Sequence, residues 1–252
     1  KSFFLRILLV IVLINLKTAA FGQVTFSYTK HTPMLEKKKK MASLLLPNGK
    51  VLVTGGHSDG PFSNVDYNSC ETYDYQTQSW SYVAPMKKAR YNHHMHFSPK
   101  GKVVVFGGED QNDVLKSTEI YDHNLNQWTD GPDMNYTHFE GRSVTLYDGR
   151  IVVLGNRGNG TRMEYYDEEL NKWFKMPTLD EYFDYGFTAT VLQDGNIFVV
   201  GSSSAYIFDV PNNKWVKINK KMYFTKIAHT AQLLPSGKVL LVGGRFNKSS
   251  LI

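Results

Sequence analysis

The chain has 252 residues, enough to bury one substantial core, and its length does not require a second domain. Aromatic residues make up 13% of the chain and glycine occurs 20 times, a composition that favours strands and turns over long helices. The formal net charge of +6 falls to +3 without residues 1–23, because that segment holds three basic residues and no acidic one. The basic character is therefore concentrated at the N-terminus, and we expect no nucleic-acid partner.

The N-terminal segment has the layout of a secretory signal peptide. Lys1 and Arg6 precede the apolar run Ile7–Ile14, and small residues follow before residue 23. Asn15 and Lys17 interrupt the run, which is shorter than the roughly 20 apolar residues of a transmembrane helix. We predict that residues 1–23 are a signal peptide and that the mature chain has no membrane span. The expected location is secreted or extracellular, or the periplasm or cell surface in a bacterium; an uncleaved anchor is the alternative.

Two local features follow the signal peptide. Four consecutive lysines, Lys37–Lys40, form a cluster that we interpret as a solvated loop, with attraction to an anionic surface or polysaccharide as the alternative. Cys70 is the single cysteine of the chain, so no intrachain disulfide can form. Stability is therefore expected to come from packed sheets.

The sequence repeats itself. Five segments carry a turn glycine, an apolar run and a second glycine six residues after the first, ending at Gly55, Gly107, Gly155, Gly201 and Gly243. In four of them an aspartate later precedes a tryptophan by six residues, at Trp80, Trp128, Trp173 and Trp215. A fixed internal period of this length is typical of repeat architectures. Because the tryptophans recur at one repeat position, we expect them to pack between adjacent sheets.

Each repeat predicts four short antiparallel strands. Ser43–Leu46 and Val51–Thr54 flank an Asn-Gly turn, the strongest local signal for a hairpin. Continuous apolar runs such as Val103–Phe106 are expected of an inner strand covered on both faces. A third strand containing Glu71 and Tyr73 then turns through polar residues into the strand that bears the tryptophan.

These motifs resemble the kelch repeat. In the first unit the matching pieces are Gly55-Gly56, Tyr73-Asp74, Trp80 and Pro85-Met86, whereas later units depart from the pattern at Gly155-Asn156 and Gly201-Ser202. The resemblance implies an all-β fold, a β-propeller of four-stranded antiparallel blades of the kelch and galactose oxidase central-domain-like superfamily. The propeller domain is expected to span residues 24–252.

The repeat boundaries predict four complete blades, at about residues 41–86, 87–134, 135–179 and 180–222, and a partial blade at residues 223–252. Residues 24–34 resemble the tail of a repeat, and we expect them to supply the outer strand that closes the last blade. Because kelch propellers usually resemble rings of six or seven blades, we interpret this sequence as a fragment.

The loops that follow the second strand of each unit, and those that lead into the next unit, are expected on one face, the default binding surface. The former shorten along the chain from residues 57–70 to residues 203–205, a variation typical of recognition loops. The candidate ligand-binding residues on this face are His57, Asp59, Phe62, Tyr91, His94, Glu109, Asp110, Tyr182, Asp184, Tyr185 and Arg245.

The histidines His93, His94 and His96 raise the question of a metal site. On a strand, His94 and His96 share one face and His93 faces the other, and His93 and His229 each precede their turn glycine by eight residues. This repetition favours a structural or channel-lining role over a metal site. The sequence elsewhere has no nucleophile motif, phosphate loop or Cys/His metal spacing, so we predict no metal site, no cofactor and no catalytic residue. The segment that begins at His229 resembles the strand on which the copper oxidases of the superfamily carry a copper-binding Tyr-His pair. In this chain Ala228 occupies the position where that resemblance implies the tyrosine.

The sequence therefore predicts a secreted, non-catalytic module that binds an extracellular protein or glycan through its loop face. The alternative is an exported carbohydrate-active enzyme, resembling either the sialic acid mutarotases or, less closely, the galactose oxidases. An intracellular adaptor for protein degradation is a third class, against which the signal peptide counts.

Overall fold

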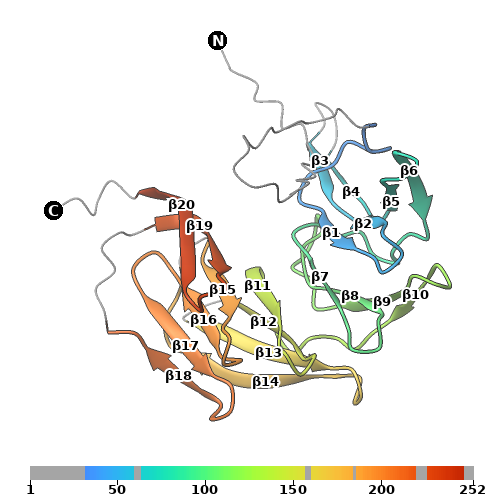
Figure 1. The fold of residues 1–252 in the computed structure, drawn as a ribbon. Coiled ribbons are helices and arrows are strands. Elements are labelled where there is room, and N and C mark those ends of the chain that lie inside the picture. The colour runs from blue at the N-terminus through green and yellow to red at the C-terminus, as the bar shows by residue number, and fades with distance from the viewer. Residues whose placement is uncertain (1–31, 60–63, 157–159, 184–185, 220–225, 247–252) are drawn as a thin grey trace.

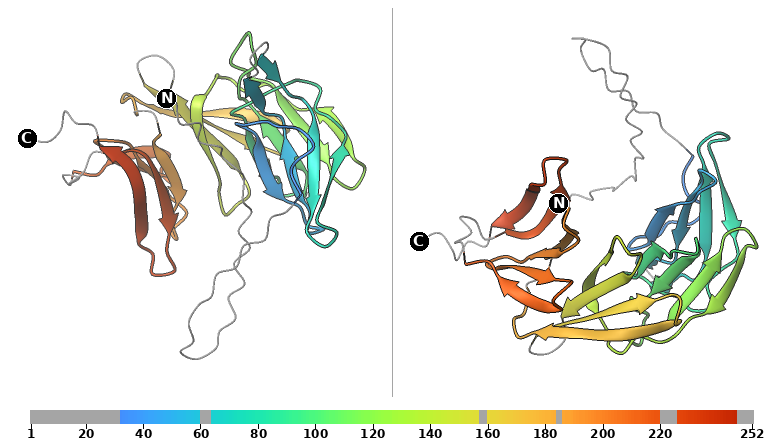
Figure 2. Two further views of the ribbon diagram at one scale, coloured as in Figure 1. Left: turned by 90° about the horizontal axis from the view of Figure 1, so that it is seen from above. Right: turned by 60° about the horizontal axis from the view of Figure 1, so that its bottom comes forward.

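The computed structural model describes residues 32–59, 64–156, 160–183, 186–219 and 226–246. All regular elements in these ranges are strands, and they form four antiparallel four-stranded sheets and two two-stranded sheets. The four-stranded sheets and the pair β19–β20 follow one another around an arc (Figures 1 and 2). This arrangement confirms the all-β class and the four-stranded antiparallel blades. Within the described ranges, no helix has the length and apolar character needed to cross a membrane.

The strands follow the repeat. Blade 1 comprises β1 (Ala42–Leu45), β2 (Val51–Thr54), β5 (Cys70–Asp74) and β6 (Ser79–Val83). Blade 2 comprises β7 (His94–Phe97), β8 (Val103–Phe106), β9 (Thr118–Asp122) and β10 (Gln127–Asp130). Blade 3 comprises β11 (Phe139–Thr145), β12 (Ile151–Asn156), β13 (Thr161–Asp167) and β14 (Lys172–Leu179). Blade 4 comprises β15 (Thr188–Val191), β16 (Ile197–Val200), β17 (Ala205–Asp209) and β18 (Lys214–Lys217), and β19 (Lys226–Leu233) pairs with β20 (Val239–Phe246).

The turn between the first two strands of each blade has the predicted chemistry. In blade 1 the N–H of Gly49 donates to the backbone carbonyl of Leu46 at 2.9 Å, and the N–H of Leu46 donates to the backbone carbonyl of Lys50 at 2.8 Å. Gly49 adopts φ +82°, a conformation that glycine reaches without steric strain. The first strands β1, β7, β11, β15 and β19 contact one another in sequence and so form the inner side of the arc.

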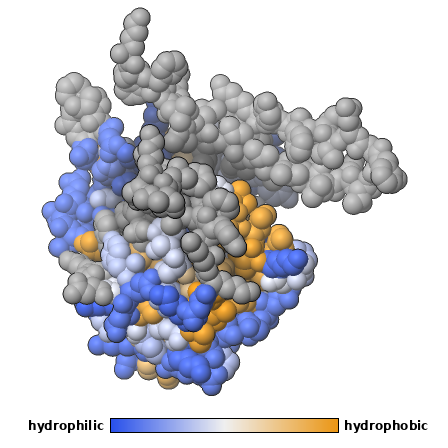
Figure 3. Space-filling model, turned by 90° about the vertical axis from the view of Figure 1, so that its left-hand side faces the viewer, coloured by the Kyte–Doolittle hydropathy of each residue, from blue (hydrophilic) through white to orange (hydrophobic). Residues whose placement is uncertain are grey.

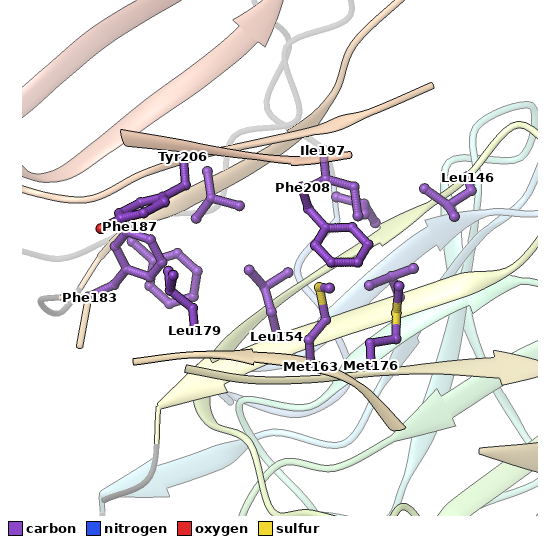
Figure 4. Packing of buried hydrophobic residues seen from close by; sticks show 13 residues of the cluster. Leu146, Leu154, Met163, Met176, Leu179, Phe183, Phe187, Ile197, Tyr206 and Phe208 are labelled. Atoms are coloured by element: carbon purple, nitrogen blue, oxygen red, sulfur yellow. The ribbon is translucent and has the colours of Figure 1, made fainter. Parts of the chain in front are cut away.

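The hydrophobic core lies between blades rather than within them. The cluster between blades 3 and 4 brings Leu154 and Met163 of one sheet against Ile197 and Phe208 of the next, all four being fully buried (Figure 4). Two further clusters join blades 1 and 2 and blades 2 and 3. Fully burying one such side chain stabilises a fold by about 1.5–3 kcal/mol, so these junctions hold the arc together.

The recurrent tryptophans pack at these junctions, as predicted. The indole N–H of Trp128 donates to the carbonyl of Ala84 in the preceding blade at 2.7 Å, and that of Trp215 donates to Pro177 at 2.8 Å. Trp173 is 2% exposed and donates instead to the hydroxyl of Thr118 at 3.0 Å. Each tryptophan therefore covers apolar surface and satisfies a polar group of the neighbouring sheet.

Trp80 of blade 1 makes the same kind of contact with the segment before β1. Its indole N–H donates to the carbonyl of Thr32 at 3.0 Å, so Thr32 takes the place that Ala84 holds for Trp128. This equivalence matches the alignment of residues 24–34 with a repeat tail. The predicted closing strand itself lies mostly at residues 24–31, outside the described residues, and stays a prediction.

A buried glutamate anchors the segment that enters blade 2. Glu119 on β9 is 1% exposed, and its carboxylate accepts hydrogen bonds from the N–H groups of Lys87 (2.6 Å) and Lys88 (3.2 Å). It also accepts a charged hydrogen bond from the guanidinium of Arg90 at 2.8 Å. A buried carboxylate requires such partners, so it fixes the path of the chain into the blade. We call this arrangement a latch.

The same latch occurs in blades 1 and 3 with different partners. Glu71 on β5 lies 3.1 Å from the ammonium of Lys38, and Glu164 on β13 accepts a hydrogen bond from the imidazole of His138 at 2.8 Å. Both carboxylates also accept hydrogen bonds from backbone N–H groups of the entering segment. For Glu164, burial by itself raises the pKa, but the hydrogen bonds from His138 and Asn135 outweigh it and lower the pKa.

Blade 4 replaces the latch by an aromatic pair. Tyr206 occupies on β17 the position that Glu119 holds on β9, and Phe183 packs edge-on against it with ring centroids 5.9 Å apart. The pair belongs to the core cluster between blades 3 and 4. The Tyr206 hydroxyl also donates to the carboxylate of Glu181 in the segment that enters blade 4, so this junction combines an aromatic contact with a hydrogen bond to a carboxylate.

Candidate functional site

The double glycines of blades 1 and 2 shape the loop face. Gly55 and Gly56 have φ angles of +59° and +114°, and the N–H of Gly56 donates to the carbonyl of Arg90 at 2.9 Å. A Cβ on Gly55 would lie 2.3 Å from that carbonyl oxygen, and one on Gly108 would lie 2.5 Å from the carbonyl oxygen of Tyr91. Only glycine permits this close approach between blades. The residue after each pair is thereby placed on the loop face.

These residues pair with the segments that enter the blades. Tyr91 and Glu109 exchange two backbone hydrogen bonds of 2.9 Å, and Lys39 and His57 exchange two of 2.8 Å. The rings of His57 and Tyr91 lie 5.0 Å apart, so the two pairs are neighbours. We call these four residues, together with Asn92, whose amide donates to Glu109 at 3.0 Å, the collar.

The longest loop contains a hairpin that the sequence analysis did not predict. Its strands are β3 (His57–Asp59) and β4 (Asn64–Asp66). The imidazole of His57 lies between two carboxylates, with its Nδ1 2.6 Å from Asp66 and its Nε2 2.6 Å from Asp59. Hydrogen bonds from Lys39 and His57 lower the pKa of Asp59. The hairpin base is therefore a hydrogen-bonded network in which Lys39 and His57 share Asp59 and His57 also contacts Asp66.

Beside the collar lies a cavity of about 720 Å³ at the ends of the innermost strands. It is lined by Lys40, Met41, Asn92, His93, His94, Gly141, Arg142, Ser143, Gly186, Ala228 and His229. Two of these residues are cationic and none carries a carboxylate. The cavity is therefore an electropositive site that suits an anionic group.

The two cations are held over aromatic rings. The ammonium of Lys40 lies 4.8 Å from the ring centroid of Tyr91, and the guanidinium of Arg142 lies 5.3 Å from that of Phe187. Arg142 also donates to the carbonyls of Phe187 and Gly141, each at 2.7 Å. A cation–π contact therefore orients each group, and backbone acceptors add to it for Arg142.

Histidines form a second, uncharged wall. His94 Nδ1 lies 2.8 Å and His96 Nε2 2.7 Å from the hydroxyl of Ser143, and His96 Nδ1 lies 2.9 Å from the hydroxyl of Thr145. Burial lowers the pKa of His94 to about 3 and that of His96 to about 4. His93 points to the other face, where its ring lies 2.7 Å from the hydroxyl of Thr54. The predicted split of these histidines between two faces of the strand is therefore observed.

The four consecutive lysines do not form a uniform solvated loop. Lys38 is fully buried in the latch of blade 1, Lys39 is half exposed and paired with Asp59, and Lys40 lines the cavity. Lys37, Lys39 and Lys40 are exposed, as the solvated interpretation expects, but Lys39 and Lys40 have the specific contacts given above. The interpretation is wrong for Lys38 because the chain enters the blade through the latch, whose glutamate needs a cation.

The structure brings several predicted site residues together and leaves others apart. His57, Asp59, Tyr91 and Glu109 meet at the collar and its hairpin, and His94 lines the adjacent cavity. Asp110 instead accepts hydrogen bonds from the N–H groups of residues 112 and 113 within its own turn, and Tyr182 is 58% exposed near blade 4. Phe62, Asp184 and Tyr185 lie outside the described residues, and Arg245 is placed only by its backbone pairing with residue 227.

Four further residues line the cavity but were not predicted from the sequence: Lys40, Asn92, Arg142 and Ser143. His93 and His229 each lie eight residues before the turn glycine of their blade. All four additional residues lie within two residues of this same position in their own blades. That repeat position was the available signal. Within the described ranges, no group of three or more histidine, cysteine, aspartate or glutamate side chains is arranged to hold a metal ion.

Comparisons with known proteins agree with this architecture. A family model described as the KLHDC2/KLHL20/DRC7 Kelch-repeats domain matches residues 41–244. Beta-scruin of Limulus polyphemus is 28% identical over 189 residues, which make up 68% of this chain and 20% of that protein. Kelch-like protein 7 of Rattus norvegicus is 30% identical over 108 residues, or 42% of this chain and 18% of that protein.

Two further similarities are to an enzyme sequence and to a solved structure. Galactose oxidase of Gibberella zeae is 32% identical over 81 residues, or 31% of this chain and 11% of that protein. The solved structure titled "Structure of YjhT" has a TM-score of 0.68 at 14% identity, covering 89% of this chain and 82% of that chain, which shows a shared fold. The chain spans a fifth or less of the length of these curated relatives.

Proposed function

The chain belongs to the KLHDC2/KLHL20/DRC7 kelch-repeats domain family, and we propose that it is a secreted, non-catalytic module that binds a protein ligand through the collar and the cavity. Kelch propellers commonly serve as protein-binding modules. The observation that carries the proposal for this chain is the cavity of about 720 Å³, whose lining includes two cations and no carboxylate. This lining favours an acidic segment of the partner.

The collar supports the same assignment. Its backbone pairs Lys39–His57 and Tyr91–Glu109 are held by the double glycines, so the surface beside the cavity is fixed before a ligand arrives. A preorganised surface loses less conformational entropy on binding than a flexible loop does. The apolar faces of His57 and Tyr91 add contact area of the kind that is enriched in protein interfaces.

Secretion rests on the N-terminal sequence, in which two basic residues precede an apolar run and a cluster of small residues. N-terminal sequencing of the chain recovered from the medium of expressing cells tests this part. We expect the mature chain to begin near residue 24, and an intact residue 1 in a cytosolic product would contradict it.

Binding is tested with arrays of acidic and neutral peptides, and of acidic and neutral glycans, applied to the mature protein. We expect acidic peptides to be retained, and we expect Lys40→Glu to abolish their retention, because it reverses a charge that lines the cavity. Lys37→Glu is the matched control, since it makes the same change three residues away at an exposed site outside the cavity lining. Retention of glycans alone would replace the protein ligand by a glycan, and equal loss in both variants would refute the role of the cavity.

A further inference from the structure

The outer side of the junction between blades 2 and 3 carries a cluster of exposed cations. Tyr136 lies in the segment that enters blade 3, and its ring centroid is 4.7 Å from the guanidinium of Arg162 on β13 and 5.2 Å from the ammonium of Lys175 on β14. The ammonium of Lys116, just before β9, donates to the backbone carbonyl of Asn135 at 2.9 Å. All three cations are exposed. We call Lys116, Tyr136, Arg162 and Lys175 the basic patch.

The cations of the basic patch have no anionic partner in the fold. Among the described residues, none of the three forms an ion pair with a carboxylate. The carboxylate that anchors the entering segment, Glu164, is fully buried and already accepts hydrogen bonds from three residues of that segment. The patch therefore presents positive charge to solvent.

Comparison of the blades shows that the fold does not require Arg162. This residue lies two positions before Glu164, and the other three blades have a serine at the same repeat position. These serines are Ser69, Ser117 and Ser204. The same four-stranded sheet forms in each case, so a short hydroxyl side chain is sufficient at this place in the frame. The guanidinium is therefore specific to blade 3.

Lys175 also differs from its equivalents in the other blades. It lies opposite Glu164 in the sheet, and the residues at the same place are Tyr82 in blade 1, Asp130 in blade 2 and Lys217 in blade 4. In blades 2 and 4 this charged residue pairs with an opposite charge of the entering segment, Lys87 or Glu181. In blade 3 the segment provides Tyr136 instead. The charge of Lys175 is therefore left for a partner outside the chain.

The chemistry of the basic patch fits a chain that carries several sulfate groups. A guanidinium has a planar fork that matches the oxygens of a tetrahedral anion, and the two lysines add point charges at either side of it. We propose that the basic patch binds a sulfated glycan. The choice of a glycan rests on the proposed secretion, because sulfated polysaccharides are extracellular polyanions. A single-stranded nucleic acid fits less well, because its bases stack on open aromatic rings, whereas the ring of Tyr136 already contacts two cations.

The test measures binding of a sulfated heparin fragment to the full chain by isothermal titration calorimetry. We expect saturable binding that weakens as the salt concentration rises, because salt screens exposed charges. Arg162→Ser combined with Lys175→Tyr is expected to weaken binding about tenfold, because it removes two of the three cations. This double variant copies Ser69 and Tyr82 of blade 1, so we expect it to fold, and circular dichroism checks that it does.

The matched control removes two lysines from another side of the molecule. The side that carries β18 and β20 has apolar surface between hydrophilic residues (Figure 3). Lys214 on β18 and Lys238 just before β20 are both exposed. Lys214→Ser combined with Lys238→Tyr introduces the same two residue types and lowers the net charge by the same amount. We expect this control to bind the heparin fragment like the unchanged chain.

Three results would overturn the proposal. The first is no saturable binding of the heparin fragment, or equal binding of the same fragment after its sulfates are removed. The second is an equal loss of affinity in the patch variant and in the control, which would assign the binding to net charge alone. The third is tighter binding of a single-stranded oligonucleotide or a phosphorylated peptide, which would replace the glycan as the ligand. Lys40→Glu is expected to keep the binding of the heparin fragment, and the patch variant to keep that of acidic peptides, so failure of the cavity and failure of the patch are distinguishable.

Discussion

Truncation of Arg90 tests the role of the latch in blade 2. The side chain of Arg90 is fully buried, and its guanidinium donates to the carbonyls of Gly107 (2.9 Å) and Ser117 (3.1 Å), to the Ser117 hydroxyl (3.1 Å) and to Glu119 (2.8 Å). Arg90→Met leaves the carboxylate of Glu119 buried with only two backbone N–H donors. Breaking a buried ion pair by removing one partner lowers the free energy of unfolding by about 3–5 kcal/mol, and we expect a loss in that range.

The assay is urea unfolding followed by tryptophan fluorescence and circular dichroism. The double variant Arg90→Met with Glu119→Leu removes both charges, and we expect it to recover more than half of the loss, because no unpaired charge remains buried. Lys87→Ala, which breaks an exposed pair, is the control and is expected to lower stability by less than about 1 kcal/mol. A single variant no less stable than this control, or a double variant no better than the single one, would refute the reasoning.

Three further predictions concern the frame. Gly55→Ala is expected to destabilise the chain far more than Gly101→Ala in thermal unfolding, since both have positive φ but a Cβ meets backbone only at Gly55; equal losses would contradict the close-approach argument. The pKa of Glu164 is lower in the folded chain than in the unfolded chain. Its ionised carboxylate therefore stabilises the fold above the unfolded-state pKa, and this stabilisation is lost as the pH falls from the unfolded-state pKa towards the folded-state pKa. In urea unfolding between pH 6 and pH 3, the free energy of unfolding of Glu164→Gln should therefore depend less on pH than that of the unchanged chain. Asn135 begins an Asn-Tyr-Thr sequon, but its amide nitrogen donates to Glu164 at 2.8 Å and to a backbone carbonyl at 3.0 Å. We therefore expect peptide mass mapping of the chain secreted by a eukaryotic host to find Asn135 without a glycan. Full glycan occupancy at Asn135 in folded protein would contradict the latch geometry.

The frame was predictable from the sequence because its signals are local and repeated. The Asn-Gly and Asp-Gly turns, the apolar runs and the aspartate-to-tryptophan spacing each specify a hairpin, and five copies in register leave few alternatives. A single tryptophan could have many roles, but four tryptophans at one repeat position indicate packing between sheets. Trp128 and Trp173 confirm this, because each donates a hydrogen bond to the preceding sheet.

The latch was not predicted because its partners are distant in sequence. Glu119 and Arg90 stand 29 residues apart, and neither belongs to a short motif. A charged residue in a strand is usually read as solvent-facing, since a buried charge is rare unless it is paired. The equivalent positions Glu71 and Glu164 could have revealed it, because a glutamate recurs there while its partner varies among lysine, arginine and histidine.

The sequence predicted the loop residues of the site but not its short hairpin or most of its strand residues. His57 and Glu109 were selected from the loops after the second strands, and Tyr91 from a loop between blades. They meet at the collar because the double glycines bring neighbouring blades together. The hairpin β3–β4 was missed because its strands are three residues long and carry no apolar alternation. Cavity residues such as Arg142 were missed because they belong to regular strands rather than to loops.

The lysine run shows how the frame determines which charges remain for function. Identical side chains at consecutive positions receive different roles, since Lys38 meets the buried carboxylate of Glu71 and Lys39 pairs with Asp59 on the hairpin. Lys40 faces the cavity, where no lining residue is acidic. Glu36, Glu71 and Asp59 are thus already paired with these lysines, and no acidic side chain lines the cavity, so the cavity lining stays positive although the chain as a whole is only modestly basic. The sign of the ligand's charge is therefore better predicted from the residues that line the cavity than from the net charge of the protein.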